Sequence, residues 1–384
     1  MTLEFLGGNK LELLVNGSAY FPALQQAFDA AQSEIYVETY IFADDDTGRR
    51  IAAALVRAAA RGVSVHVLVD GFGSKGTFEQ TRQLLSAANI EVLIFGPKTS
   101  PLTLRRNRLR RLHRKLVVVD ARVAFVGGIN VIDDMHTPRH TPPRYDYAMR
   151  IEGPLLARVL EQAERLWHRV AWASLRRSAQ RHAPVNAAVK GNQRAALVVR
   201  DNVSHRSDIE DAYLAAIAAA REEIVIANAY FFPGARFRHA LRDACVRGVR
   251  VVLLLQGRVE YALLYYATLA LYGSLLDAGV EIYEYHKSFL HAKVAVIDRR
   301  WATVGSSNID PFSLMLAREA NVVVDDAPFS QELRVSLHEH MQEGAKVVAK
   351  STWSHQPLWR RILIWSAYGC ARLLMGVIGY GGKH

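Results

Sequence analysis

The chain of 384 residues contains little cysteine. Its two cysteines, Cys245 and Cys370, lie far apart and do not have the spacing of metal ligands. The sequence therefore predicts neither a framework of disulfide bonds nor a zinc site, and it suits a reducing compartment.

The N-terminal stretch lacks the features of a secretory signal peptide. Glu4, Lys10 and Glu12 interrupt MTLEFLGGNKLELLVNG, so no apolar core forms there, and no basic leader precedes one. We therefore expect the folded body of the protein to remain in the cytoplasm.

Acidic residues are fewer than basic ones. The chain has 48 lysines and arginines against 37 aspartates and glutamates, a formal net charge of +11. Half of the residues are hydrophobic, which excludes a disordered chain. The positive excess indicates a polyanionic partner, either nucleic acid or an acidic lipid surface, but it also fits a merely solubilising surface.

A polar pattern occurs twice with unchanged internal spacing. LHRKLVVVD with VGGIN in the first copy matches LHAKVAVID with VGSSN in the second, and each matched pair lies 178 residues apart. The two sets are His113, Lys115, Asp120, Gly127 and Asn130, and His291, Lys293, Asp298, Gly305 and Asn308.

The duplication extends to the surrounding segments. In each half, amphipathic helical stretches alternate with short apolar strands, a pattern typical of α/β folds with buried sheets. The expected strands are 35–42, 63–69 and 90–95 in the first half and 224–232, 249–255 and 280–285 in the second. We predict two similar α/β halves, 1–175 and 195–346, a linker over 176–194 and a tail over 347–384.

The repeated residue types suit the handling of a phosphate ester. Residues two apart on a strand share a face, so His113 projects with Lys115 and His291 with Lys293. Lysine neutralises the charge that protects a phosphodiester, and asparagine adds neutral donors. One histidine can attack phosphorus while the other protonates the departing oxygen. A lone histidine on an apolar strand is usually a core residue, but that does not explain two matched sets.

The duplicated motif resembles the HxKxxxxD…GxxN signature of the phospholipase D superfamily, over nearly the whole chain. The resemblance implies two halves packed about a pseudo-two-fold axis, with both motifs in one cleft. It implies His113 as the nucleophile and His291 as the general acid and base, although the near symmetry allows the reverse. The predicted catalytic set is His113, Lys115, Asp120, His291, Lys293 and Asp298.

The same resemblance assigns supporting residues. Lys115, Lys293, Asn130 and Asn308 would bind the substrate phosphate, and the motif aspartates would be largely structural. Acids further along each half, Asp146 and Glu319, would orient the histidines, because a carboxylate on the far nitrogen sets the tautomer. No metal or cofactor is expected.

One departure separates the two copies. The second reads Gly-Ser-Ser-Asn where the first reads Gly-Gly-Ile-Asn, so Ser306 and Ser307 have no hydroxyl counterpart. We expect an additional phosphate contact from one of these hydroxyls in the second half.

Three segments bear on the substrate. The basic run 104–112, with Arg105, Arg106, Arg108, Arg110 and Arg111, suits a nucleic-acid backbone or anionic headgroups, or is a solvated loop. The uncharged stretch Tyr261–Leu276 is either a buried helix or a helix at a lipid-facing cleft. The apolar tail 358–380 contains Arg360, Arg361 and Arg372, which favours an interfacial or re-entrant anchor over a span; a docked core helix is the alternative.

These features together resemble bacterial cardiolipin synthases of the phospholipase D type, in the shorter forms without N-terminal transmembrane helices. The resemblance implies transfer of a phosphatidyl group from phosphatidylglycerol to a second lipid, with anionic phospholipids and a membrane surface as partners and no nucleic acid. A peripheral place on the cytoplasmic side of the bacterial inner membrane follows. The alternative is a hydrolase of phospholipid or nucleic-acid diesters, and the oligomeric state stays open.

Overall fold

A computed structural model describes residues 3–96, 110–135, 137, 141–176, 185, 187–354 and 357–375. Several stretches that the sequence singles out lie outside the described residues. They are Arg105, Arg106 and Arg108 of the basic run, residues 177–184 and 186 of the expected linker, and the end of the tail.

The first half alternates strands and helices up to the motif and then turns antiparallel. Its elements are β1 Leu6–Val15, α1 Asn16–Ala30, β2 Glu34–Thr39, α2 Asp46–Ala60, β3 Ser64–Asp70, α3 Glu79–Ala87, β4 Glu91–Phe95, β5 Arg111–Leu112, β6 Lys115–Val119, β7 Val123–Gly127, β8 Arg144–Tyr145, β9 Tyr147–Glu152 and α4 Leu155–Ala173.

The second half repeats this order and adds the tail. Its elements are β10 Gln193–Arg200, α5 Asp208–Ala219, β11 Glu223–Asn228, α6 Ala235–Val246, β12 Arg250–Gln256, α7 Ala262–Asp277, β13 Glu281–Tyr285, β14 Phe289–Leu290, β15 Lys293–Ile297, β16 Trp301–Gly305, α8 Pro311–Met315, β17 Ala317–Asp325, α9 Ala327–Gly344, β18 Ala345–Val347, α10 Lys350–Ser354 and α11 Leu358–Met375.

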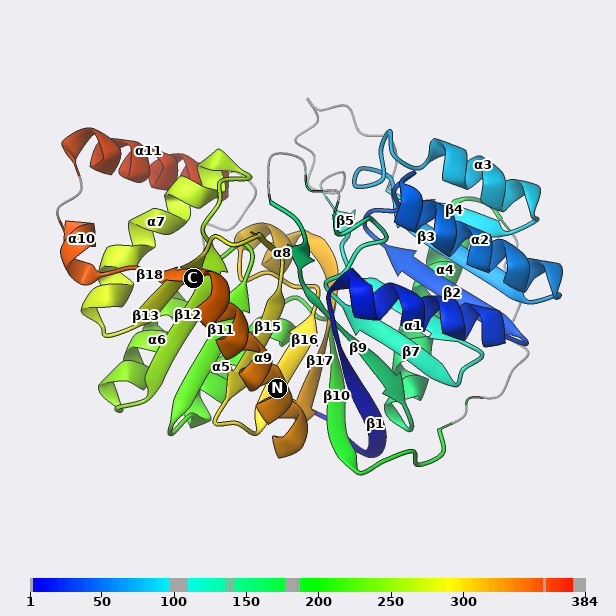
Figure 1. The fold of residues 1–384 in the computed structure, drawn as a ribbon, viewed down its shortest axis with the longest axis horizontal. Coiled ribbons are helices and arrows are strands. Elements are labelled where there is room, and N and C mark those ends of the chain that lie inside the picture. Colours follow the sequence, from blue (N-terminus) through cyan, green and yellow to red (C-terminus); the bar gives the residue numbers. More distant parts are fainter. Residues whose placement is uncertain are drawn as a thin grey trace.

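One large sheet runs through both halves (Figure 1). Its order from one edge is β4-β3-β2-β6-β7-β9-β1, and from the other, after β18, it is β13-β12-β11-β15-β16-β17-β10. Each strand of one series corresponds to the strand at the same place in the other. The two series meet where β1 pairs antiparallel with β10. This order confirms two similar α/β halves related by a pseudo-two-fold axis.

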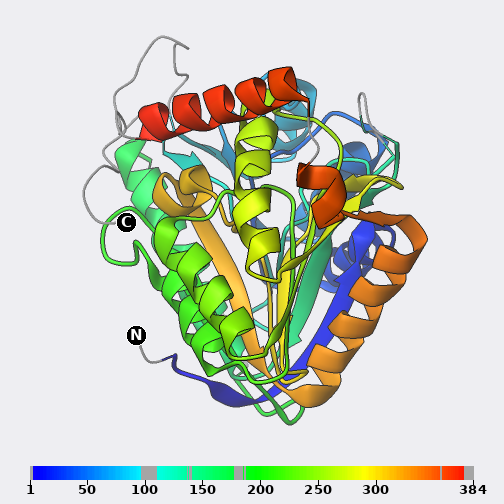
Figure 2. The same cartoon turned by 90° about the vertical axis from the view of Figure 1, so that its left-hand side faces the viewer.

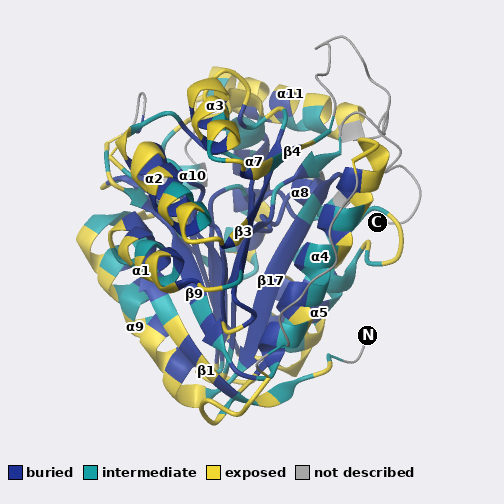
Figure 3. Ribbon diagram, turned by 90° about the vertical axis from the view of Figure 1, so that its right-hand side faces the viewer, coloured by how far each residue is buried: buried dark blue, intermediate teal, exposed yellow. Residues whose placement is uncertain are grey.

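The closing helices join the halves on one face of the sheet. Side chains of α4 and α9 belong to a single core that includes strands of both halves. Separate cores lie under α1 and α2 in the first half and under α5, α6 and α7 in the second. Figure 3 shows the resulting layers, with buried strands between helices whose outer faces are exposed.

Most of the predicted elements are confirmed, with shifted ends. Gly62 and Gly248 follow α2 and α6 at φ 89° and 85°, the left-handed conformation expected at a helix C-terminus. The apolar periodicity of the sequence predicts a first helix over 23–33, but α1 already begins at Asn16 and includes Pro22. Helix interiors usually exclude proline, so periodicity alone starts this helix too late.

Candidate active site

The two histidines lie at the meeting point of the halves, each just before its motif strand. The His113 backbone N–H donates to the Arg318 carbonyl at 3.0 Å, and that of His291 donates to the Tyr145 carbonyl at 2.8 Å. Both acceptors belong to the opposite half. The short strands β5 and β14 add to this exchange, since β5 pairs with β17 and β14 with β8.

The orienting carboxylates are exchanged in the same way. His113 Nδ1 lies 2.9 Å from Glu319 Oε1, and His291 Nδ1 lies 2.6 Å from Asp146 Oδ2. The sequence names both acids but does not show which histidine each one serves, and the structure pairs each acid with the histidine of the other half. The reason is topological: β9 and β17 flank the central β1–β10 pair, so a side chain at the end of either strand reaches the other half's histidine.

Each pairing leaves one histidine nitrogen available for chemistry. An ionised carboxylate only accepts hydrogen bonds, so it holds the proton on Nδ1 and leaves Nε2 unprotonated in the neutral ring. The side chains of His113 and His291 are 16% and 10% exposed. Both are buried enough for an oriented ring and open enough for a substrate to reach.

The motif lysines are deeply buried beside the histidines. Lys115 Nζ donates to the His113 carbonyl at 2.6 Å and lies 5.5 Å from the centroid of the Tyr40 ring. Lys293 Nζ donates to the His291 carbonyl and lies 3.5 Å from Asp146 Oδ2. Among the described residues, no cluster of three or more histidine, cysteine, aspartate and glutamate side chains is arranged to hold a metal ion.

The electrostatics of this cluster favour an anion. The pKa of Lys115 is lowered to about 7, mainly by burial; the charge of Glu319 opposes this shift and that of Lys293 adds to it. Burial also lowers the pKa of His113 and His291, with Lys293 contributing in both cases. Four cationic or potentially cationic groups thus face two carboxylates. A bound phosphodiester would restore their pKa values by adding negative charge.

The carboxylates of Glu319 and Asp146 are held in place by different contacts. Ser306 Oγ donates to Glu319 Oε2 at 2.6 Å. The matching residue in the first half is Gly128, where a Cβ would meet Asp146 Oδ1 at 2.3 Å. The longer glutamate is therefore paired with a serine, and the shorter aspartate with a glycine that lets it approach.

These contacts contradict the expectation of an additional phosphate contact from the serines. Ser306 is fully buried against Glu319, and the Ser307 hydroxyl donates to the Asn308 carbonyl at 3.3 Å. Both hydroxyls therefore donate their hydrogen bonds to acceptors within the protein.

Asp120 and Asp298 lie at the far ends of the motif strands from the histidines, and their contacts there favour a structural role over a catalytic one. Asp120 accepts hydrogen bonds from the backbone N–H groups of residues 32–34, and Asp298 from those of residues 221–223. Burial alone would raise the pKa of Asp120, but these donors lower it overall. Both aspartates anchor the turn that enters the second strand of their half, a structural role like the one the family resemblance implies.

The two asparagines lie at the same end of the sheet as the histidines. Lys115 is opposite Gly127 in the β6–β7 ladder, which carries Asn130 back beside His113. Asn130 Oδ1 accepts from the Ile41 N–H at 3.1 Å, and its Nδ2 has no hydrogen-bond partner in the described part of the chain. Asn308 is buried in contact with Ser313. Phosphate binding by these two side chains stays a prediction.

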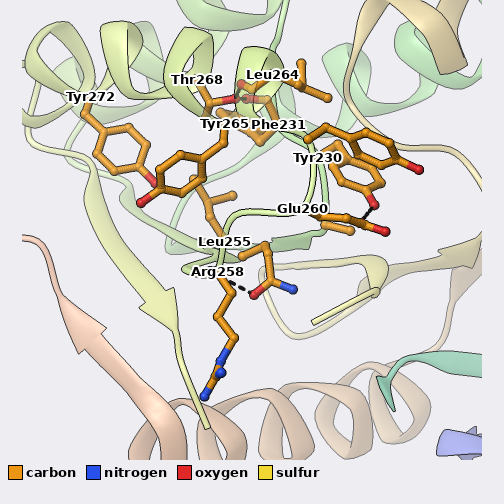
Figure 4. Close-up of a pocket in the computed structure, with 12 residues that line it drawn as sticks. Tyr230, Phe231, Leu255, Arg258, Glu260, Leu264, Tyr265, Thr268 and Tyr272 are labelled. Carbon is orange, nitrogen blue, oxygen red and sulfur yellow. Dashed lines mark hydrogen bonds between the residues drawn. The ribbon is translucent and has the colours of Figure 1, made fainter. Parts of the chain in front are cut away.

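The motifs do not predict a pocket, but one lies next to this cluster. Figure 4 shows the residues that line it. It lies between the end of β11 and α7, with Tyr230, Glu260 and Tyr261 at its polar side. Tyr230 donates to Glu260, whose carboxyl interacts electrostatically with Lys293. Its more apolar side is formed by Leu264, Tyr265 and Tyr272 of α7. The uncharged stretch 261–276 is therefore both a partly buried helix and the wall of a cleft.

The tail helix α11 packs crosswise over one end of α7 (Figure 2). Ile364 and Ala367 are buried against it, whereas Trp359, Ile362 and Trp365 are 67%, 60% and 59% exposed. Among the helices of the described residues, none is long and apolar enough to cross a membrane. Helix α11 is therefore docked on the protein, as one alternative for the tail predicts, and it also presents an exposed apolar face, as an interfacial anchor would.

Three comparisons relate the chain to known proteins. A family model described as "Cardiolipin synthase, PLD-like domain" matches residues 24–167 and 213–341. Cardiolipin synthase B of Escherichia coli (strain K12) is 41% identical over 92% of this chain and 86% of its own length. The major cardiolipin synthase ClsA of Bacillus subtilis (strain 168) is 31% identical over 93% of this chain and 74% of its own length.

Solved structures share the fold at low sequence identity. Phosphatidylserine synthase of Haemophilus influenzae superposes with a TM-score of 0.70 at 14% identity, covering 97% of this chain and 96% of the other. Polyphosphate kinase of Porphyromonas gingivalis gives 0.59 at 12% identity, covering 95% of this chain and 53% of the other.

The structural role of the motif aspartates is testable. We expect Asp120→Ala to lower the free energy of unfolding by about 1–3 kcal/mol, because several backbone N–H groups lose their acceptor. Urea denaturation followed by circular dichroism measures this. Asp29→Ala, which removes an exposed ion pair with Arg57, should change it by less than about 0.5 kcal/mol. An Asp120→Ala protein of unchanged stability that has lost activity would show a direct catalytic role instead.

Proposed function

The chain belongs to the cardiolipin synthase family of phospholipase D-like enzymes, and from this premise we propose that it synthesises cardiolipin. It transfers a phosphatidyl group from phosphatidylglycerol, or another phospholipid, to the hydroxyl of a second phospholipid. The observation that carries the proposal is the pair of exchanged histidine–carboxylate contacts beside two buried lysines, because this arrangement supplies a nucleophile, an acid and an anion site together.

In the first step, His113 Nε2 attacks phosphorus and forms an N–P bond. The bond from phosphorus to the glycerol oxygen breaks, and protonated His291 donates its proton to that oxygen. Glu319 holds the Nδ1 proton of His113 and stabilises the ring as it becomes positive. Lys115 and Lys293 neutralise the non-bridging oxygens, with Asn130 and Asn308 as neutral donors.

In the second step, neutral His291 takes the proton of the acceptor hydroxyl. The acceptor oxygen attacks phosphorus, the N–P bond breaks and His113 returns to its neutral form. His291 needs a proton at the start, although burial lowers its pKa in the empty site. The phosphodiester supplies the negative charge that raises this pKa again, so substrate binding prepares the acid.

The function is tested by incubating the protein with phosphatidylglycerol and analysing the lipids by mass spectrometry. We expect cardiolipin and released glycerol, and no product with His113→Ala. Phosphatidic acid as the sole product would indicate the competing hydrolase activity and contradict the transferase proposal.

A substrate with a good leaving group separates the two histidine roles in the same experiment. Phosphatidyl-p-nitrophenol needs no acid catalyst, so His291→Ala should release p-nitrophenol in a burst and retain the phosphatidyl group, visible as an increase in intact protein mass. His113→Ala should give neither. The opposite result would exchange the roles of the histidines.

We place the acceptor lipid in the pocket beside α7. Its tyrosines and leucine suit the glycerol backbone and upper acyl chains, while the Glu260 carboxylate can accept a hydrogen bond from a headgroup hydroxyl. Partial burial raises the pKa of Glu260 above its usual range, and Arg144 and Lys293 counteract this. Holding the acceptor hydroxyl there favours alcohol over water at the intermediate.

We therefore expect Glu260→Gln to lower the ratio of cardiolipin to phosphatidic acid by about tenfold, the effect of one lost charge-assisted hydrogen bond. Total consumption of phosphatidylglycerol should change less than this ratio. Glu343→Gln, which removes an exposed carboxylate paired with Lys287, serves as the control. An unchanged product ratio in Glu260→Gln would remove this residue from acceptor binding.

We also propose that the protein binds peripherally to an anionic membrane through α11. The exposed face of this helix carries two tryptophans and several aliphatic side chains, flanked by Arg361 and Arg372. Tryptophan favours the headgroup region, and each arginine near an anionic surface contributes about 1 kcal/mol. Both cysteines are unpaired, which suits the reducing, cytoplasmic side.

Replacing Trp359, Ile362 and Trp365 together with serine should weaken sedimentation with vesicles containing phosphatidylglycerol by at least about tenfold, since three apolar side chains no longer enter the interface. The secondary structure should persist because these side chains are exposed. Trp172→Ser, at a tryptophan that is 81% exposed on α4, is the matched control. Undiminished sedimentation of the triple variant would place the anchor elsewhere.

A further inference from the structure

A second pocket lies between α4 and the ends of β10 and β17, and five of its eleven lining residues are arginines. We name it the arginine pocket; its cations are Arg114, Arg165, Arg169, Arg200 and Arg318. Arg165 and Arg169 come from one face of α4 and are exposed at the rim. Arg114 and Arg200 are each 3% exposed and form the floor.

Two of these arginines have carboxylate partners. Arg114 forms a buried pair with Glu38, and it also donates to the Gln162 carbonyl at 2.8 Å. Arg165 pairs with Glu161 on the outer side of α4 at 2.6 Å. These two charges are therefore already compensated.

The other three have no carboxylate partner within ion-pair distance among the described residues. Arg200 donates through Nη1 to Asn202 and to the Ala317 carbonyl, and its buried Nε has no hydrogen-bond partner in this part of the chain. The buried Nε of Arg318 is likewise unsatisfied, and its guanidinium lies 5.9 Å from the centroid of the Phe95 ring. For Arg169 the described residues offer neither a hydrogen bond nor an ion pair.

The acids nearby do not balance this charge. Asp201 is the one carboxylate that lines the pocket, and its Oδ1 accepts three backbone N–H groups of residues 203–205. Three guanidiniums beside a single carboxylate leave an excess of about two positive charges. Burial lowers the pKa of Arg318, and the neighbouring Arg114 and Arg169 lower it further, as expected where like charges are crowded.

We propose that the arginine pocket is a second anion site, which binds a phosphate group between Arg169, Arg200 and Arg318. A phosphate monoester or inorganic phosphate carries about −1.5 to −2 charges at neutral pH, close to the excess in the pocket. Its oxygens also match the planar donor forks of arginine, including the buried Nε groups that lack an acceptor.

The site is separate from the catalytic one. Arg114 follows His113 and Arg318 precedes Glu319, and neighbouring residues of an extended chain project to opposite sides. The catalytic pair therefore faces the cleft, while the two arginines face α4. An anion in the arginine pocket lies behind the active site and does not compete directly with the substrate. The proposal stands independently of the reaction assigned above.

Isothermal titration of the protein with inorganic phosphate tests the proposal. We expect two binding steps, one at the active-site lysines and one at the arginine pocket. Arg169→Gln should weaken one step by about tenfold or more, the effect of a lost charge-assisted hydrogen bond. Because Arg169 is exposed, this variant should fold normally, and Arg318→Gln should weaken the same step. Arg158→Gln, an equal charge change on α4 outside the pocket, should leave both steps unchanged.

Lys293→Ala identifies the step at the active site, which it should remove while the pocket step remains. Dihexanoyl phosphatidylglycerol, below its micellar concentration, then distinguishes the source of the phosphate. Displacement of phosphate from the pocket indicates a lipid headgroup, and failure to displace it indicates a free phosphate compound; both results support an anion site. A single binding step that Arg169→Gln and Arg318→Gln leave unchanged would overturn the proposal, whether or not the protein makes cardiolipin.

Discussion

The active site depends on the exchange of carboxylates between the two halves. Each histidine takes its orienting acid from the opposite half, and each also donates its backbone N–H to the strand or segment that carries this acid. Neither half therefore contains a complete histidine–carboxylate pair. Both histidine–carboxylate pairs form only when the two halves dock. Misalignment of the central β1–β10 pair would therefore disturb both histidines together.

The assembled cluster is electrostatically incomplete without a substrate. Two buried lysines face two carboxylates that are already hydrogen-bonded to histidines. Burial, with a smaller contribution from the charge of Lys293, lowers the pKa of Lys115 to about 7. A phosphodiester anion opposes this shift and favours protonation of His291. The same principle applies at the arginine pocket, where buried guanidiniums lack enough acids. The arginine pocket keeps unmatched positive charge, and the active site gathers two lysines and two histidines around two carboxylates, so both suit an anionic group.

The second half differs from the first in the helix beside the pocket, where selectivity for a lipid would be set. Helix α7 is long, rich in tyrosine and uncharged up to Leu276, and it supports α11 on its outer side. The corresponding α3 is short and polar. The pocket beside α7 thus connects the catalytic lysine Lys293, through Glu260, to the helix that carries the exposed apolar face. If α11 binds the membrane as we propose, acyl chains would follow this apolar surface while the headgroup reaches the histidines.

The sequence by itself determined the duplication and the α/β halves, and it predicts which residues handle the phosphate. These follow from local rules: strand alternation places histidine and lysine on one face, and the unchanged spacing shows that both copies keep the same local structure. Which acid serves which histidine could not be read in this way, because Asp146 and Glu319 act across an interface that only tertiary packing creates. The contacts of Ser306 and of the motif aspartates likewise depend on tertiary packing. Their contacts are made to groups distant in the chain, and a pattern of spacings contains no information on such contacts until the sheet is assembled.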